Sequence, residues 1–142
     1  MRSLQVALSE KIPGSKYFTW GEALWLPSVE GYAAPDSAQQ SNISRLAKEL
    51  DRVREHFGRP MNVHSWLRPE RYNQLIGGAK ASLHRVGLAV DFSLIGLASS
   101  EVQKVLSTNK NLWAYRGELG TVTWTHLDLG TGEWFYPRDL RQ

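Results

Sequence analysis

The stretch Ser82–Phe92 most constrains the fold, because it joins a tight turn to a strand with a carboxylate on its open face. Gly87, between His84 and Asp91, supplies a bend that a Cβ would resist. A strand is expected over Ala89–Leu94, because large apolar residues alternate there with small or polar ones. Its core face would carry Val90, Phe92 and Leu94. Asp91 therefore points to the opposite face, where a small neighbouring side chain leaves room for an ion.

A second strand, expected over Val122–Leu129, brings a further imidazole toward this carboxylate. One of its faces would carry Val122, Trp124, His126 and Asp128. His84, Asp91 and His126 then make two imidazoles and one carboxylate, which is the protein ligand set of a catalytic zinc with its fourth position left to water. The chain has no cysteine, so a thiolate metal site is excluded.

The order and spacing of these residues resemble one family along most of the chain. The pattern Ser-x-His-x-x-Gly-x-Ala-x-Asp, followed by Trp-x-His, is carried here by Ser82, His84, Gly87, Ala89, Asp91, Trp124 and His126. Upstream, Ser65–Arg68 resembles a Ser-Gly-Tyr-Arg turn, Asn73–Ala79 resembles an Asn-x-x-x-Gly-Gly-Ala segment, and Phe18–Leu24 resembles a Phe-x-x-x-Glu segment. These motifs resemble the zinc D-Ala-D-Ala carboxypeptidases, peptidoglycan peptidases that share a fold with the hedgehog signalling domain.

The resemblance implies a zinc-dependent peptidase acting on peptidoglycan stem peptides, with Zn²⁺ held by His84, Asp91 and His126. The zinc would lower the pKa of its bound water and polarise the peptide carbonyl. The bond cut would be D-Ala-D-Ala, as in a carboxypeptidase, or L-Ala-D-Glu or a cross-link, as in an endopeptidase. The resemblance leaves this choice open. A closed pocket around Arg68 would fit the first, and an open groove the second.

The general base departs from the family pattern. In much of the family an acidic residue precedes the last His by three positions, where this chain has Thr123. Two carboxylates remain as candidates. Asp128 shares a strand face with His126, and Glu118 lies in the loop before that strand. Asp128 equally fits a role as orienter of a ligand imidazole, and the alternative role of Glu118 is that of a solvated loop carboxylate.

Three further residues are candidates for binding substrate. Arg68 matches the family's arginine near the metal, where a planar cation can hold a carboxylate or stabilise an oxyanion. A salt bridge with Glu70 or another acid is its alternative role. Ser82 matches a substrate-contacting serine, with a hydrogen bond to the loop backbone as the alternative. Trp66, in the turn beside Arg68, is expected to line the cleft.

The remaining pattern predicts an α+β fold, with a small, mostly antiparallel sheet flanked by helices in one domain, 1–142. We expect no defined element over residues 1–17. The predicted elements are a capped helix Thr19–Leu24, a loop 26–40, a main helix Ser41–Phe57 ended by Gly58, a strand Met61–Ser65, helices 69–75 and 98–106, and a hairpin 127–136 that closes the sheet.

Charge and hydropathy exclude other classes of protein. Lys and Arg number 17 against 14 Asp and Glu, and the basic residues are scattered, so we expect no nucleic-acid partner. We expect no membrane span and see no signal peptide, because the apolar run Leu4–Leu8 is too short. The expected oligomeric state is a monomer. The alternative function is a non-catalytic, zinc-containing cell-wall-binding or interaction module of the same fold, which Thr123 in place of an acid would fit.

Overall fold

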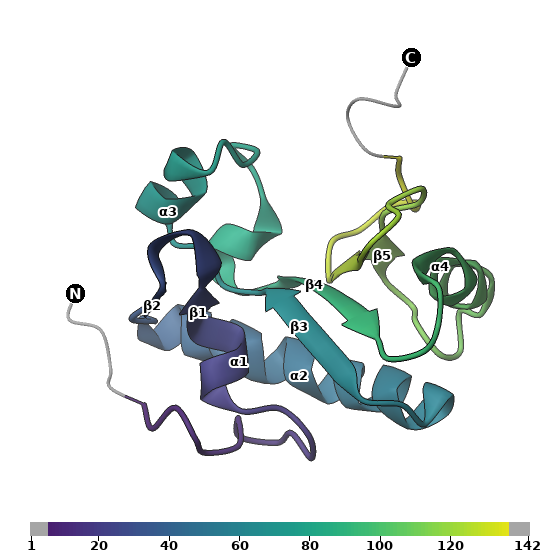
Figure 1. Ribbon diagram of the computed structural model, residues 1–142, viewed down its shortest axis with the longest axis horizontal. Helices are drawn as coiled ribbons and strands as arrows, with labels where there is room; N and C mark the ends of the chain where they lie inside the picture. Colours follow the sequence, from purple (N-terminus) through teal and green to yellow (C-terminus); the bar gives the residue numbers. More distant parts are fainter. Residues whose placement is uncertain (1–5, 137–142) are drawn as a thin grey trace.

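The computed structural model describes residues 6–136, and over this range the chain forms helices and two antiparallel sheets, which confirms the α+β prediction (Figure 1). In chain order the elements are α1 Trp20–Leu24, β1 Trp25–Leu26, η1 Pro27–Val29, β2 Gly31–Tyr32, α2 Ser37–Phe57, β3 Met61–Ser65, α3 Glu70–Leu75, η2 Leu83–Val86, β4 Ala89–Leu94, α4 Ser99–Thr108, β5 Arg116–Gly117 and β6 Thr125–Asp128. The η elements are single turns of 3-10 helix.

The main sheet has four strands in the order β3-β4-β6-β5, and each neighbouring pair is antiparallel. On β4, Asp91 lies opposite Ser65 of β3 and opposite His126 of β6. Residues directly opposite one another in antiparallel strands have side chains on the same face. The register therefore places these three side chains in one row across the sheet, although they are far apart in sequence.

Helix α2 runs beneath the main sheet, while α3 and α4 lie toward opposite ends of the molecule (Figure 1). The buried apolar stripe of α2 consists of Ile43, Leu46, Ala47, Leu50 and Val53. These residues belong to the same apolar core as Val90 and Phe92 of β4. With one face of the sheet covered in this way, the polar row on β4 and β6 is left on the other face.

The predicted start of α2 at Ser41 and the predicted loop 26–40 are wrong in part. Helix α2 begins at Ser37, because the Asp36 carboxylate accepts a hydrogen bond from the Gln39 amide at 2.7 Å and the Gln39 side chain accepts one from the Asp36 amide at 2.9 Å. The rest of that segment holds η1 and the short β1–β2 pair. The predicted end of α2 is confirmed, with Gly58 in the left-handed region at φ 64°.

Strand β6 is shorter than predicted, because α4 holds the residues before it in a loop. The buried side chain of Gln103 donates to the carbonyl of Thr121 at 2.9 Å and accepts from the amide of Gly120 at 2.9 Å. Val122 lies outside the strand and is 83% exposed. The prediction that His126 and Asp128 share a face is unaffected, since both lie within β6.

The predicted hairpin 127–136 is wrong. The outer partner of β6 is β5, which precedes it in the chain, and residues 133–136 form no strand. Instead Phe135 makes a single parallel bridge to Glu118. The chain turns after β6 because the Asp128 carboxylate accepts the Gly130 amide at 2.9 Å. Trp134 then packs against Gly117, where a Cβ would come within 2.4 Å of its ring.

The other predicted elements are confirmed, with ends displaced by a residue or two. The capping box of α1 joins Thr19 and Glu22, as predicted. Strands β3 and β4 have the predicted bounds. Of residues 1–17, those from 6 onward contain only an isolated bridge from Lys11, and residues 1–5 lie outside the described range. No helix within residues 6–136 combines the length and apolar character needed to cross a membrane.

Candidate metal centre

The candidate site lies on the open face of the main sheet, where Asp91 and His126 form a cross-strand pair. The Nδ1 of His126 is 2.8 Å from Oδ1 of Asp91, and both side chains are 13% exposed. This closeness is a direct consequence of the register, because opposite residues in antiparallel strands have their Cβ atoms about 5 Å apart.

His84 reaches the same point from the turn η2. The hydroxyl of Ser82 accepts the His84 amide at 3.2 Å, and Gly87 ends the turn at φ 85°. The Nδ1–H of His84 donates to the carbonyl of Trp66 at 2.7 Å. That hydrogen bond fixes the tautomer, so the lone pair of Nε2 points into the site, where it is buried without a hydrogen-bond partner.

These three side chains fit a divalent metal ion. Their ligand atoms all lie within 4.8 Å of one another. The Nε2 of His84 is 3.4 Å from Oδ1 of Asp91, and two ligands of a tetrahedral zinc at about 2.0 Å are roughly 3.3 Å apart. An imidazole lone pair facing a carboxylate oxygen is repulsive unless a cation lies between them. His84, Asp91 and His126, the predicted ligands, are therefore brought together with a donor set that suits zinc.

The electrostatics of the site favour deprotonated ligands at two of the three positions. Burial lowers the pKa of His84, which keeps this imidazole neutral. Burial alone would raise the pKa of Asp91, but His84 and His126 outweigh it and hold the pKa well below its usual range. Burial likewise opposes the charged form of His126, yet its hydrogen bonds to Asp128 and Asp91 outweigh that effect and raise its pKa to about 9.

Both carboxylate oxygens of Asp128 have hydrogen-bond partners. Its Oδ2 is 2.8 Å from Nε2 of His126. Its two oxygens also accept Nε and Nη2 of Arg116 at 3.0 and 3.2 Å. Arg116 lies opposite Asp128 across β5–β6, and its guanidinium stacks over the ring of Phe135 at 4.8 Å. A carboxylate bound in this way orients the ligand imidazole so that Nδ1 faces Asp91.

Glu118 continues the polar row. Extending the β5–β6 register by one residue places Glu118 opposite His126, and its amide donates to the His126 carbonyl at 3.0 Å. The side chain lines the same cavity as the three candidate ligands. The sequence placed Glu118 only in a loop, because nothing in its spacing reveals which residue it faces across the sheet.

Arg68 and Ser82, the predicted substrate-binding residues, both line the cavity. Arg68 does not pair with Glu70, which binds Arg85 at 2.8 Å. Its Nη2 donates instead to Oδ2 of Asp91 at 2.9 Å and its Nε to the hydroxyl of Ser65 at 2.8 Å. The guanidinium thus holds a candidate metal ligand while lying at the wall of the cavity.

The prediction that Trp66 lines the cleft is wrong. Its side chain is 0% exposed and packs edge-on against Phe18 at 5.9 Å between ring centroids. The indole N–H donates to the carbonyl of Gly87 at 3.1 Å. Trp66 supports the site through its backbone carbonyl, which binds His84.

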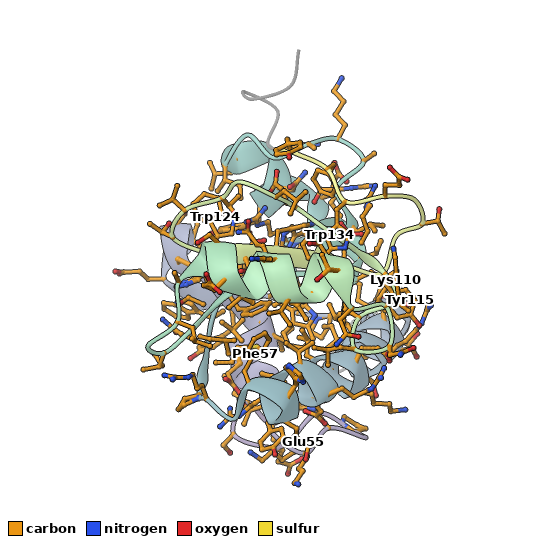
Figure 2. The ribbon with its side chains drawn as sticks, turned by 90° about the vertical axis from the view of Figure 1, so that its right-hand side faces the viewer. Glu55, Phe57, Lys110, Tyr115, Trp124 and Trp134 are labelled. Atoms are coloured by element: carbon orange, nitrogen blue, oxygen red, sulfur yellow. The ribbon has the colours of Figure 1, made fainter. Side chains whose placement is uncertain are left out.

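The cavity has a volume of about 730 Å³. Its wall also includes Trp124, which belongs to the Trp-x-His motif, and Arg116 and Phe135, which belong to no motif of the sequence. Figure 2 shows Trp124 on one side of α4 and Phe57 on the other. Arg116 could have been found from sequence only with the β5–β6 register, which places it opposite Asp128.

Comparison with known proteins gives a match to a protein family. A family model described as Peptidase M15 matches residues 19–128, which is most of the chain. The matched range contains His84, Asp91 and His126 together with both candidate bases. No curated protein and no solved structure matches the chain significantly.

Proposed function

Because the chain belongs to the Peptidase M15 family, we propose that it is a zinc-dependent peptidase that hydrolyses the stem peptides of peptidoglycan. The family assignment confirms the resemblance to the zinc D-Ala-D-Ala carboxypeptidases. The observation that carries the proposal is the convergence of Nε2 of His84, Asp91 and Nδ1 of His126 at the wall of an open cavity. When bound, the zinc supplies a Lewis acid that polarises the scissile carbonyl and activates the attacking water.

We assign the general base to Glu118. It faces His126 across β5–β6 and lines the cavity, so its carboxylate lies on the side from which substrate approaches. Thr123, at the family's usual position for the acid, carries no group that can accept this proton. Glu118 takes the proton from the attacking water and returns it to the leaving amine.

We assign Asp128 to orientation of His126. Both of its oxygens are already held, by Arg116, by His126 and by the Gly130 amide. A carboxylate with those partners cannot accept the water's proton without losing an ion pair at a side chain that is 2% exposed. In this proposal Glu118 is the general base and Asp128 is a positioning residue.

Arg68 has two tasks in this proposal. Its contact with Asp91 fixes the orientation of a metal ligand. Its guanidinium also lies at the cavity wall, where it stabilises negative charge that develops on the carbonyl oxygen. Ser82 caps the His84 turn with its oxygen and keeps its hydroxyl proton for the substrate backbone.

The test is mass spectrometry of purified peptidoglycan before and after digestion by the zinc-loaded protein, with a chelator as control. New peptide fragments that disappear with the chelator are expected. A zinc-loaded protein that releases no fragment would exclude the peptidase.

Two variants separate the roles of the carboxylates. Glu118→Gln should keep its zinc but lose about 10²-fold or more in kcat, the usual contribution of a general base. Asp128→Asn should instead weaken zinc binding by about 10- to 100-fold. A Glu118→Gln protein that retains zinc and full activity would refute the assignment. If the protein binds zinc but cleaves no peptidoglycan peptide, it is better described as the alternative, a non-catalytic zinc-containing module.

A further inference from the structure

A second cavity adjoins the metal centre. Its volume is about 410 Å³, and it shares Arg68, Asp91 and Trp124 with the cavity that holds the candidate ligands. Because the two cavities share these lining residues, space for a ligand lies beside the candidate metal position in two places. Trp124 and Ile76 border the second cavity and are 38% and 36% exposed, so it is open to solvent along this rim.

Besides Arg68 and Asp91, four parts of the fold line this second cavity. Its walls are Pro27 and Ser28 of η1, His64 and Ser65 of β3, Tyr72 and Ile76 at α3, and Thr123 and Trp124 before β6. The amide of Ser28 donates to the Tyr72 hydroxyl at 3.0 Å, which ties η1 to α3. The His64 imidazole is fixed by a 2.8 Å hydrogen bond to the Ser93 hydroxyl. These contacts make the cavity a formed feature of the fold.

The second cavity offers little to a terminal carboxylate. Among its lining residues the Arg and Asp side chains are Arg68 and Asp91, and these two pair with each other at 2.9 Å. The Nε of Arg68 donates to Ser65, and the proposed function assigns its remaining N–H groups to the reacting carbonyl oxygen, so little of its charge is left for a terminal carboxylate. The remaining wall is hydroxyl groups, one imidazole, and aromatic and aliphatic surface. Such a wall suits a neutral stretch of peptide whose backbone continues beyond the site.

We propose that this cavity is a substrate subsite for a neutral, chain-internal segment of the peptide, and that the protein is an endopeptidase. The inference rests on the proposed peptidase function and specifies its substrate. The peptide lies across Asp91, with residues on one side of the scissile bond in the first cavity and residues on the other side in the second. Recognition does not depend on a free carboxylate next to the cleaved bond.

Three synthetic stem peptides test the inference on the zinc-loaded full chain. One has a free carboxylate after the residue that follows the scissile bond, the second is the same peptide with a C-terminal amide, and the third is extended by further residues. We expect cleavage of the extended peptide at an internal bond, and a change of less than about 3-fold in kcat/KM on amidation. Loss of a bond between a guanidinium and a carboxylate would cost about 10-fold or more.

The outcomes separate the two hypotheses. Cleavage confined to the last residue, with a loss of about 10-fold or more on amidation, would overturn the endopeptidase while leaving the peptidase intact. Absence of cleavage in all three peptides, with zinc bound, would overturn the peptidase function on which the inference rests.

Matched variants test the subsite itself. Thr123→Trp fills the second cavity and should lower kcat/KM for the extended peptide by about 10-fold, mainly through KM. Val122→Trp is the control, because Val122 is exposed, does not line this cavity and should change kcat/KM by less than about 2-fold when replaced. Ile76→Asp, with Leu75→Asp as control, repeats the test by adding charge. Unchanged kinetics in Thr123→Trp and Ile76→Asp would exclude the subsite.

Discussion

Two carboxylates hold the imidazole of His126, and this arrangement organises the site at the scale of single residues. Asp91 faces its Nδ1 and Asp128 its Nε2, each at 2.8 Å. His84 has a different environment, because a backbone carbonyl takes its Nδ1–H and leaves Nε2 without a partner. In the absence of metal, the imidazole of His84 is therefore neutral, whereas the imidazole of His126 is protonated.

Replacement of His84 by Ala should abolish zinc binding, because it removes the buried nitrogen that faces Asp91 across 3.4 Å. We expect the zinc content of the purified protein to fall by at least about 10-fold, measured by elemental analysis. His56→Ala is the control, since His56 is exposed near the end of α2 and does not line the cavity. A His84→Ala protein that retains stoichiometric zinc would refute the ligand set.

Replacement of Arg116 by Met should weaken zinc binding by about 10- to 100-fold, although Arg116 is not a ligand. Its guanidinium fixes both oxygens of Asp128, and Asp128 in turn orients His126. Arg116→Lys keeps the charge but not the bidentate geometry, so its zinc affinity should be intermediate. Zinc affinity is measured by competition titration with a chelator. If the Met variant and the unmodified protein bind zinc equally well, the orientation of Asp128 does not depend on Arg116.

At the scale of elements, the site depends on the register of three strands and on one turn. The β4–β6 register brings Asp91 and His126 together, and the β5–β6 register brings Arg116 to Asp128. The turn η2 is not positioned by pairing between strands. It is held by Gly87 at φ 85° and by contact with α2, since a Cβ on Gly87 would lie 2.8 Å from the Ile43 side chain.

Replacement of Gly87 by Ala should destabilise the protein by about 1–3 kcal/mol, because it adds left-handed backbone strain and a clash with Ile43. Gly58→Ala is the matched control. Gly58 also has positive φ, at 64°, but a Cβ added there would meet no atom within 4 Å. Denaturant unfolding of both variants separates strain from packing. Equal losses in the two would show that α2 does not hold the turn.

At the scale of the whole molecule, a zinc ion held at the proposed site would add to the stability of the fold. Zinc bound only by the folded chain stabilises it by about 2.7 kcal/mol at a free concentration 100-fold above its Kd. The binding site draws on β4, β6 and η2 at once. A bound zinc would therefore add a further link between the turn η2 and the paired strands β4 and β6.

Zinc affinity should rise with pH up to about 9, the raised pKa of His126. Below that pH the imidazole is protonated in the metal-free protein, and zinc must displace one proton. His84 and Asp91 need lose none, because the pKa of each is lowered. The expected slope is about 10-fold per pH unit, in competition titrations with a chelator on either side of neutrality. A flat profile would show that His126 binds zinc without losing a proton.

The amino-acid sequence by itself determined the local chemistry. The alternation over residues 89–94 placed Asp91 on the open face, and the capping residues of α1 and Gly58 fixed two helix ends. The ordered motifs gave the family and the three candidate ligands. These features depend on spacing within one element or one turn, which a linear pattern records.

Only the tertiary structure decided what faces the site. Trp66 is buried in the core because its indole ring packs against Phe18 and its N–H donates to the Gly87 carbonyl. Residues 133–136 do not pair with β6, because β5 occupies that edge of the strand. Glu118 and Arg116 came to His126 and Asp128 through the same β5–β6 register. Pairing between strands is a choice among competing edges, and it depends on packing and long-range hydrogen bonds that no local pattern specifies.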